Sequence, residues 1–325
     1  MKKIAVVGAG LTGLVLASRL RNVAAVEVFD KSSRLGGRMS TRVTGGFSFD
    51  HGAQYFTAKS GEFKQFLNPF LESGTVAQWD AKLVRISTGE CIPVERAYPT
   101  YVAVPGMNAL ATSLGENLNV HRSWHVDSVF VDGGKWQLTS KQNEKAGPFD
   151  WLISTLPAPQ AQELLKPLPF LDLNYRNASM LACFSLMYGF SEPLDLPFDG
   201  AFFEDDILGF TAVNSSKPGR QGGFSLLVQT QNSWAQENLD ISENDLKSVI
   251  RAKLITQCGI DVTDAVHNDT HRWLYASTSQ AAGQPFLMDE SQKLVVAGDW
   301  CVKGRVEAAF ESGTYVAETL LKTFQ

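Results

Sequence analysis

Three glycines near the start of the chain have the spacing of a turn that binds a pyrophosphate. Gly8, Gly10 and Gly13 follow a short apolar run and precede a helical pattern of leucines. In such a turn the first glycine permits the tight bend, the second lets the backbone approach a phosphate, and the third lets helix and strand pack closely. The amides of Leu11 and Thr12, at the start of the helix, would face the phosphates with the helix dipole behind them.

An acidic residue follows the second apolar run. Asp30 lies about 20 residues beyond the glycines, where an acid accepts hydrogen bonds from an adenosine ribose. The alternative is a tight turn without a ligand, but strand, helix and acid agree on a dinucleotide site. A second glycine-rich element follows, and it would bring Gly37 and the Arg38 guanidinium to the same pyrophosphate, flanked by Lys31 and Met39.

These motifs together resemble the FAD-binding fold shared by amine oxidases, protoporphyrinogen oxidase and related flavoproteins. The C-terminal region completes the resemblance, with an apolar run that ends in Gly298-Asp299 and a later turn that reaches Val306 and Glu307. The resemblance implies that Gly298 and Asp299 lie at the ribityl chain of the cofactor. It also implies that the helix after the turn points its N-terminus at the flavin. Cys301 lacks the context of a covalent flavin link, so the implied cofactor is non-covalent FAD.

Residues 47–57 narrow the resemblance to one family. The run Asp50-His-Gly-Ala-Gln-Tyr-Phe-Thr, together with Gly-Gly-Arg-Met, is similar to renalase and its bacterial relatives. The resemblance implies that Ala53 and Gln54 contact the cofactor and that Val126 contacts the adenine. Arg272 would either meet a substrate phosphate or form a structural salt bridge. The substrate contacts implied in this way are Gln54, Tyr55, Phe56, Thr57, Tyr101, Arg272, Trp273 and Tyr275.

Composition limits the classes of partner. The 325 residues are 44% apolar, which is ample for two packed domains, and the net charge of -5 gives no electrostatic footprint for nucleic acid. No apolar run approaches the ~20 residues of a membrane helix, and no signal peptide is apparent, so we expect a cytoplasmic protein without a membrane partner. The four cysteines lack metal-site spacing, and the histidine pairs have neither a helix signal nor an acid of the metalloprotease type beside them, so no metal site is predicted.

The order of strand and helix patterns predicts an α/β protein with two domains. The resemblance implies an FAD-binding dinucleotide fold of the glutathione-reductase-like, amine oxidase type, with a second α+β substrate domain on a mostly antiparallel sheet. Apolar periodicity predicts helices over residues 60–72 and 242–258. It predicts strands over residues 180–190, 200–203, 208–213 and 223–230. The expected FAD-binding domain covers residues 1–58, 102–157 and 281–325, and the expected substrate domain covers residues 59–101 and 158–280.

The implied activity is that of an oxidase, and we assign no catalytic side chain because a flavin carries the difficult chemistry itself. The resemblance implies oxidation of aberrant dihydronicotinamide dinucleotides, the 1,2-dihydro and 1,6-dihydro forms of NAD(P), to NAD(P)⁺. Molecular oxygen would take the electrons and leave as hydrogen peroxide. Tyr55, Phe56, Trp273 and Tyr275 could form an aromatic, mostly uncharged slot for such a flat substrate.

Two alternatives stay open at this stage. One is an amine oxidase or dehydrogenase of the same fold that acts on a small amine. The other is a non-catalytic flavin redox sensor. The sequence leaves the oligomeric state and the choice between NAD and NADP forms open.

Overall fold

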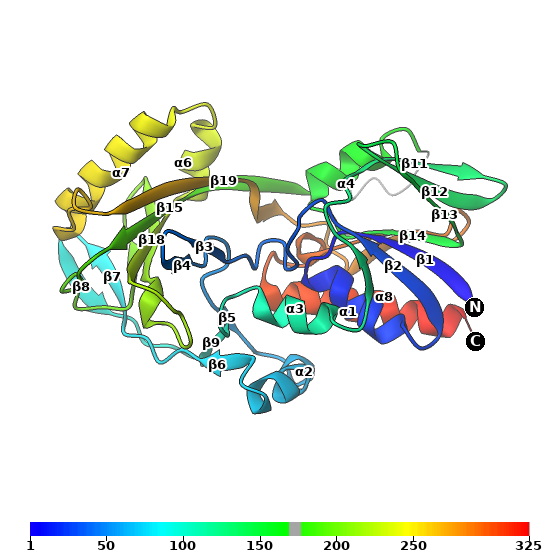
Figure 1. Ribbon diagram of the computed structural model, residues 1–325, viewed down its shortest axis with the longest axis horizontal. Helices are drawn as coiled ribbons and strands as arrows, with labels where there is room; N and C mark the ends of the chain where they lie inside the picture. Colours follow the sequence, from blue (N-terminus) through cyan, green and yellow to red (C-terminus); the bar gives the residue numbers. More distant parts are fainter. Residues whose placement is uncertain (169–176, 325) are drawn as a thin grey trace.

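The computed structural model describes residues 1–168 and 177–324, and it forms two lobes that are each built on one large sheet (Figure 1). Both chain ends lie at the outer end of the same lobe (Figure 1). In the described part of the chain, no helix is both long enough and apolar enough to cross a membrane.

The first lobe contains a six-stranded sheet with the strand order β10-β2-β1-β14-β21-β20. The strands pair in parallel except for β20, which is antiparallel to β21. Their bounds are β1 (Lys2–Val7), β2 (Ala24–Phe29), β10 (Asn119–His121), β14 (Trp151–Ser154), β20 (Phe286–Asp289) and β21 (Leu294–Ala297). Ile4 and Val6 of β1 join one hydrophobic cluster and Ala5 and Val7 join another, so β1 is buried on both faces. This explains its unbroken apolar sequence.

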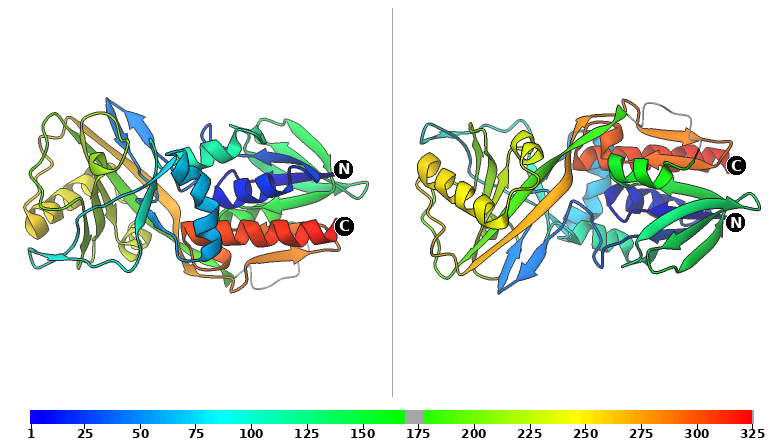
Figure 2. Two further views of the ribbon diagram at one scale, coloured as in Figure 1. Left: turned by 90° about the horizontal axis from the view of Figure 1, so that it is seen from below. Right: turned by 90° about the horizontal axis from the view of Figure 1, so that it is seen from above.

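Different layers cover the two faces of this sheet. One face carries three helices, α1 (Leu11–Leu20), α3 (Ala109–Gly115) and α8 (Val306–Thr323), which share the same hydrophobic cluster. The other face carries α4 (Ala158–Leu165) and a three-stranded sheet of β11 (Val126–Asp132), β12 (Lys135–Ser140) and β13 (Lys145–Phe149). Helices α1 and α8 run side by side (Figure 2), and a Cβ atom at Gly313 would lie only 2.6 Å from the carbonyl oxygen of Thr12.

The second lobe contains a seven-stranded sheet with the strand order β19-β15-β18-β17-β16-β7-β8. Its strands pair antiparallel except for β16 and β7, which are parallel. The expected mostly antiparallel sheet is therefore confirmed. Its strands are β7 (Leu83–Ser87), β8 (Glu90–Pro93), β15 (Ser179–Phe190), β16 (Gly200–Phe203), β17 (Leu208–Val213), β18 (Phe224–Thr230) and β19 (His267–Gln280). The paired β15 and β19 are long, and they extend from this lobe toward the first (Figure 1).

Two helices cover the outer face of this sheet, α6 (Asn232–Glu237) and α7 (Glu243–Cys258). The Ser242 hydroxyl accepts a hydrogen bond from the Asp245 amide at the start of α7, and Gly259 ends the helix with φ +70°. In the same way Ser60 caps α2 (Gly61–Glu72), which packs against the first lobe. Both predicted helices are therefore confirmed.

The remaining short elements lie outside the two large sheets. They are β3 (Arg42–Thr44), β4 (Phe47–Phe49), β5 (Phe56–Thr57), β6 (Val76–Gln78), β9 (Thr100–Ala103), and the 3-10 turns η1 (Asn214–Ser216) and η2 (Asp299–Cys301). Strands β3 and β4 pair as a hairpin, and β5, β9 and β6 form a small sheet. The segment between β4 and β5, residues 50–54, lies between the lobes, and we call it the strap.

Candidate functional site

The glycine turn after β1 is tightly packed on one side and open on the other. Gly8 has φ +112°, a conformation that favours glycine, and a Cβ atom at Gly13 would lie 2.1 Å from the Gly8 carbonyl oxygen. Gly10 is the N-cap of α1, and a Cβ atom there would meet no described atom within 4 Å. Gly37 lies beside it, since its own Cβ would be 3.5 Å from the Cα of Gly10. The open space at Gly10 is a cradle at a helix N-terminus, where a phosphate binds favourably.

Several of the predicted cofactor residues have buried side chains. Leu11 and Thr12 are buried in the first turn of α1, and Met39 and Val126 belong to hydrophobic clusters. With their side chains buried, Leu11 and Thr12 have only backbone amides to offer a ligand at the cradle, and that contact stays a prediction. Lys31 is exposed.

Asp30 holds the end of β2 against the glycine turn. Its carboxylate accepts hydrogen bonds from the amides of Ala9 (2.6 Å) and Ser32 (2.7 Å). Burial raises the pKa of Asp30 above its ordinary value, although these two donors and Lys31 oppose the shift. A carboxylate has about four acceptor positions, so Asp30 retains capacity for the hydroxyls of a ribose.

Arg38 and Asp299 meet each other in a bidentate ion pair. The Nη1 atom of Arg38 lies 3.0 Å from Oδ2 of Asp299, and Nη2 donates to Oδ1. Nη1 also donates to the Ala276 carbonyl at 3.2 Å. The sequence predicts a pyrophosphate contact for Arg38 and a ribityl contact for Asp299. The structure joins the two side chains, and so links the two distant halves of the predicted cofactor site, while both cofactor contacts stay predictions.

The start of α8 also approaches α2. Gly298 precedes η2, and its amide donates to Ser312 at 2.9 Å. Val306 and Glu307 form the first turn of α8. The Glu307 carboxylate accepts hydrogen bonds from the amides of Ser60 (2.7 Å) and Lys59 (3.1 Å). The side chain of Glu307 therefore binds the N-terminal end of α2.

The strap packs closely on the first lobe. The Ala53 amide donates to the Arg38 carbonyl at 2.9 Å. A Cβ atom at Gly52 would lie 1.9 Å from that same carbonyl oxygen, which leaves room for glycine alone. Arg38 therefore holds the strap with its backbone while its guanidinium binds Asp299.

Side chains of the seven-stranded sheet hold the strap from the other side. The His51 carbonyl accepts from the Ser185 hydroxyl and from the Trp273 indole, both at 2.7 Å. The Gly52 carbonyl accepts from the Gln229 amide at 2.8 Å. The sequence does not indicate these roles of Ser185 and Gln229, since a serine and a glutamine inside apolar strands give no signal of a partner far along the chain.

Gln54 points into the protein and is buried. Its amide nitrogen donates to the carbonyls of Asp50 and, at 3.0 Å, Gly52, and its Oε1 accepts from Lys217 Nζ at 3.1 Å. Lys217 and Arg220 both pair with the Asp50 carboxylate. The sequence does not indicate that these two cations are buried, because Lys217-Pro-Gly-Arg220 has the composition of an exposed turn.

Two of the predicted substrate aromatics lie on the strap side of the seven-stranded sheet. The Tyr55 ring lies 6.0 Å from the rings of Trp79 and of Phe210 in β17. Trp273 of β19 stacks on the His51 ring at 5.4 Å. Tyr55, which directly follows the strap in the chain, and Trp273 of β19 therefore both lie on the strap side of this sheet.

The structure places the other predicted substrate residues elsewhere. Phe56 is buried, with its ring 6.0 Å from those of Phe63 and Tyr101, and Thr57 pairs with Thr100 in the small sheet. These residues form part of a core that supports the strap.

Arg272 lies on the opposite face of β19 from Trp273. Its guanidinium is exposed and donates to the Leu239 carbonyl at 2.6 Å, beside α6 and α7. Neither of the expected roles, a substrate phosphate contact or a salt bridge, matches this contact. Tyr275 is half-buried and packs against the hydrophobic cluster of the first lobe.

Two histidines next to the strap are held neutral at physiological pH. Burial, followed by the nearby His271 and Arg42, lowers the pKa of His51 to about 4. Burial and Arg42 likewise lower the pKa of His271 to about 4. The His51 and His271 rings lie 4.9 Å apart, and Nδ1 of His51 has no hydrogen-bond partner among the described residues. The two imidazole rings that contact Trp273 are thus neutral at pH 7.

This histidine pair predicts a loss of stability in mild acid. The folded protein holds His51 at a pKa of about 4, whereas an unfolded histidine titrates near 6.5, so the unfolded chain binds more protons between these values. The stability contributed by His51 is fully present above pH 6.5, and about 3 kcal/mol of it is lost as the pH falls to 4. Urea unfolding at several pH values measures the slope. The His51→Asn variant should show a shallower slope in this window, and equal slopes would contradict the assignment.

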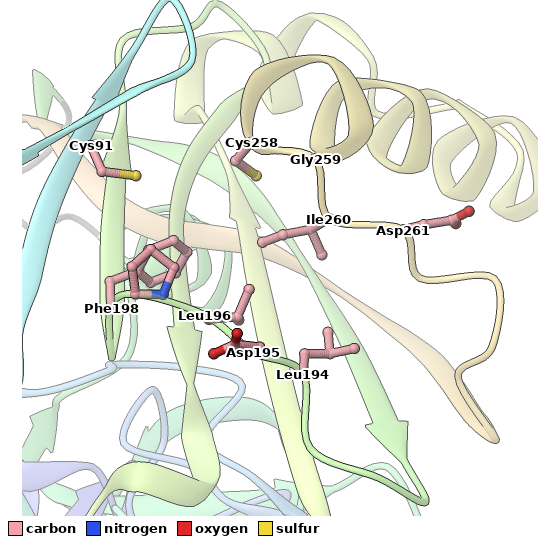
Figure 3. Close-up of a pocket in the computed structure, with 10 residues that line it drawn as sticks. Cys91, Leu194, Asp195, Leu196, Phe198, Cys258, Gly259, Ile260 and Asp261 are labelled. Atoms are coloured by element: carbon pink, nitrogen blue, oxygen red, sulfur yellow. The ribbon is translucent and has the colours of Figure 1, made fainter.

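A separate pocket of about 210 Å³ lies far from the strap, at the outer end of the second lobe. Cys91, Cys258, Phe198 and Ile260 are among its lining residues (Figure 3). Its side chains come from β8, from the segment before β16 and from the end of α7. None of the predicted cofactor or substrate residues lines it.

Comparisons with known proteins agree with this arrangement. Residues 6–70 match the model of the NAD(P)-binding Rossmann-like domain, and residues 85–321 match that of the flavin containing amine oxidoreductase family. Renalase from Mus musculus is 24% identical over 352 residues, and the match covers 98% of this chain and 99% of that protein.

Solved structures share the fold at lower identity. Cyclohexylamine oxidase from Brevibacterium oxydans superimposes with a TM-score of 0.77 at 12% identity, over 99% of both chains. An oxidoreductase from Methanosarcina mazei has a TM-score of 0.73 at 14% identity, over 97% of this chain and 100% of that one. The family match covers most of the sequence, and the cradle at Gly10 fits a dinucleotide cofactor. The chain therefore belongs to the flavin containing amine oxidoreductases, and within them it is a renalase-like oxidoreductase that uses FAD.

Proposed function

We propose that FAD binds non-covalently along the cradle and the strap. Gly10 leaves space for the pyrophosphate, and the amides of Leu11 and Thr12 would donate to it. Asp30 has acceptor capacity left for the adenosine ribose. Ala53 and Gln54 would then lie along the flavin, which requires the strap to hold its position between the two lobes.

We propose that the enzyme oxidises dihydronicotinamide dinucleotides, the 1,2-dihydro and 1,6-dihydro forms of NAD(P), to NAD(P)⁺. Bound FAD supplies the hydride acceptor, and oxygen takes up the electrons. The balanced reaction converts one dihydro-NAD(P), one O₂ and one proton into NAD(P)⁺ and hydrogen peroxide. The chain itself needs to orient a flat ring and exclude other donors, and it needs no nucleophile for this task.

The observation that carries this proposal is the aromatic surface beside the strap, where the neighbouring histidines are neutral. Tyr55 lies against Trp79 and Phe210, and Trp273 stacks on a histidine whose pKa is about 4. A dihydronicotinamide ring is flat and neutral, so it would gain stacking contacts there without losing hydration of a charge.

An amine is the second candidate reductant. The flavin containing amine oxidoreductase match and the cyclohexylamine oxidase fold favour it. The charges near the strap argue against it, because Lys217 and Arg220 together outnumber Asp50 by one positive charge. A protonated amine would be repelled by this excess, whereas the phosphates of a dinucleotide would be attracted.

Anaerobic stopped-flow mixing of the FAD-loaded enzyme distinguishes these candidates. We expect 1,2-dihydro-NAD to bleach the flavin within seconds, ordinary 1,4-NADH to do so far more slowly, and amines to have no effect. Air should restore the flavin absorbance with one peroxide per NAD⁺. Bleaching by amines alone would overturn the dihydronicotinamide proposal and leave the FAD assignment intact.

Two tyrosine variants test the role of the aromatic surface in the same experiment. Tyr55→Leu removes a ring contact, and we expect bleaching by 1,2-dihydro-NAD to slow about 3- to 10-fold. Tyr315→Leu makes the same chemical change at an exposed position on the outside of α8, and it should react like the wild type. Equal rates for both variants would show that Tyr55 does not contact the substrate.

We also propose the division of the chain into an FAD-binding domain over residues 1–58, 102–157 and 281–325 and a substrate domain over residues 59–101 and 158–280. The distribution of strands supports it. All six strands of the parallel-type sheet come from the first set of ranges, and all seven strands of the other sheet come from the second.

A further inference from the structure

Three charged side chains are completely enclosed between the lobes. The side chains of Asp50 and Lys217 are 0% exposed and that of Arg220 is 1% exposed. Oδ2 of Asp50 lies 3.1 Å from Lys217 Nζ and 2.6 Å from Arg220 Nη2. Oδ1 accepts from the Thr41 hydroxyl at 2.7 Å and from the Met107 amide at 3.1 Å. One carboxylate thus meets two cations, and the cluster carries one excess positive charge when Lys217 is protonated.

Lys217 connects this cluster to the strap. Its ammonium lies within hydrogen-bond distance of three acceptors, Asp50 Oδ2 (3.1 Å), Gln54 Oε1 (3.1 Å) and Asn214 Oδ1 (2.9 Å). Nζ also lies 5.5 Å from the centre of the Trp79 ring. An ammonium has three N–H donors, so every donor has a partner. Arg220 differs, because it binds Asp50 and the Ala103 and Pro218 carbonyls without touching Gln54.

Burial and the charges within the cluster together set the pKa values of Asp50 and Lys217. Burial raises the pKa of Asp50, but Lys217 and Arg220 outweigh this effect and leave it below its ordinary value. Burial lowers the pKa of Lys217 to about 8; Asp50 opposes this shift and Arg220 adds to it. Among the residues that contact Lys217, Gln54, Asn214 and Trp79 are uncharged, so Asp50 and Arg220 are the charged groups that face it.

We propose that Lys217 is a positioning residue that fixes Gln54 in the strap and places an excess positive charge behind the flavin-facing backbone. The inference rests on the FAD contacts proposed for Ala53 and Gln54, and it does not depend on which reductant the enzyme accepts. Lys217 donates directly to the side chain of Gln54, which is one of the residues proposed to contact the cofactor. A buried cation is poorly screened, so it would favour the more negative, reduced state of the cofactor and raise its reduction potential.

The test uses the FAD-loaded enzyme with Lys217→Met and Arg220→Met as a matched pair. Each change removes one positive charge and leaves Asp50 paired with the remaining cation. Only Lys217→Met also releases Gln54. Dye-equilibrated photochemical reduction, without any nicotinamide, gives the midpoint potential, and fluorescence titration of apoprotein gives the affinity for oxidised FAD.

We expect both variants to lower the midpoint potential, by about 30 mV, which corresponds to a tenfold change in relative affinity for a two-electron couple. We expect Lys217→Met alone to weaken the binding of oxidised FAD, by about tenfold. An unchanged potential in folded Lys217→Met overturns the proposal, and so does equal loss of FAD affinity in both variants.

A measurement on the wild type remains decisive if Lys217→Met does not fold. The potential should fall more steeply with pH above about pH 8, because Lys217 then loses its proton in the oxidised enzyme and regains it on reduction. If the slope of the midpoint potential against pH stays the same from pH 7 to pH 9, the proposal is overturned. The dihydronicotinamide proposal fails by a different readout, the anaerobic bleaching by substrate, so the two failures can be told apart.

Discussion

Replacing Gly10 by alanine is expected to leave the apoprotein folded and to weaken FAD binding by about 10- to 150-fold. Gly10 has φ −76° and ψ 177°, which alanine adopts without strain, and its Cβ would meet no described atom within 4 Å. The added methyl group would instead occupy the cradle and keep the pyrophosphate from the helix amides. Loss of hydrogen bonds to a charged group costs about 1.5–3 kcal/mol, which gives the expected range.

Gly13→Ala is the matched control for this experiment. It adds the same methyl group three residues away, but here the Cβ would lie 2.1 Å from the Gly8 carbonyl oxygen. Overpacking of this kind typically costs about 1–3 kcal/mol, so the unfolding midpoint of the apoprotein should fall. Fluorescence titration with FAD and urea unfolding of both variants measure the contrast. Wild-type FAD affinity in Gly10→Ala would place the pyrophosphate elsewhere.

The fold could be predicted largely because its signals are local. The spacing of Gly8, Gly10 and Gly13 reports a backbone geometry within a few residues, and the structure has strand, turn and helix in that order. The helix caps at Ser60 and Ser242 are local in the same sense. The family match and the renalase relative likewise confirm the predicted family and the FAD cofactor.

Individual side-chain partners could not be predicted in the same way. Arg38 and Asp299 were each assigned to a ligand, and their 261-residue separation in sequence hides the fact that they bind each other. Glu307 was likewise assigned to the cofactor, whereas its carboxylate binds the amides of residues 59 and 60. Each of these groups is a strong acceptor or donor, and sequence alone does not say which of several partners it finds.

The aromatic residues show a related limit. Tyr55 and Phe56 are adjacent in sequence, but in an extended segment successive side chains point to opposite sides. Tyr55 therefore lies toward the seven-stranded sheet, and Phe56 lies in the core beside α2. The same alternation separates Arg272 from Trp273 on β19. A sequence motif selects a stretch of chain, and only the strand register decides which residues face the site.

Replacing Asp50 by asparagine is expected to destabilise the protein by about 3–5 kcal/mol, since it leaves two buried cations without a counter-charge. The change keeps the shape of the side chain, so the loss reports charge more than packing. Urea unfolding at pH 7 measures it. The loss should become smaller at pH 9, because Lys217, whose pKa is already only about 8, would give up its proton more readily without Asp50.

An exposed ion pair provides the control for this experiment, and a double variant tests whether Lys217 and Asp50 are energetically coupled. Glu204 pairs with Arg85 at 3.2 Å, but these side chains are 49% and 53% exposed, so Glu204→Gln should leave the unfolding midpoint unchanged within error. Combining Asp50→Asn with Lys217→Met removes one of the two unpaired cations, and it should recover part of the stability lost in Asp50→Asn alone. If the double variant were instead as unstable as the sum of the two single changes, Lys217 and Asp50 would not be coupled. The strap would then owe its position to the carbonyl contacts of His51 and Gly52 rather than to the buried charges behind it.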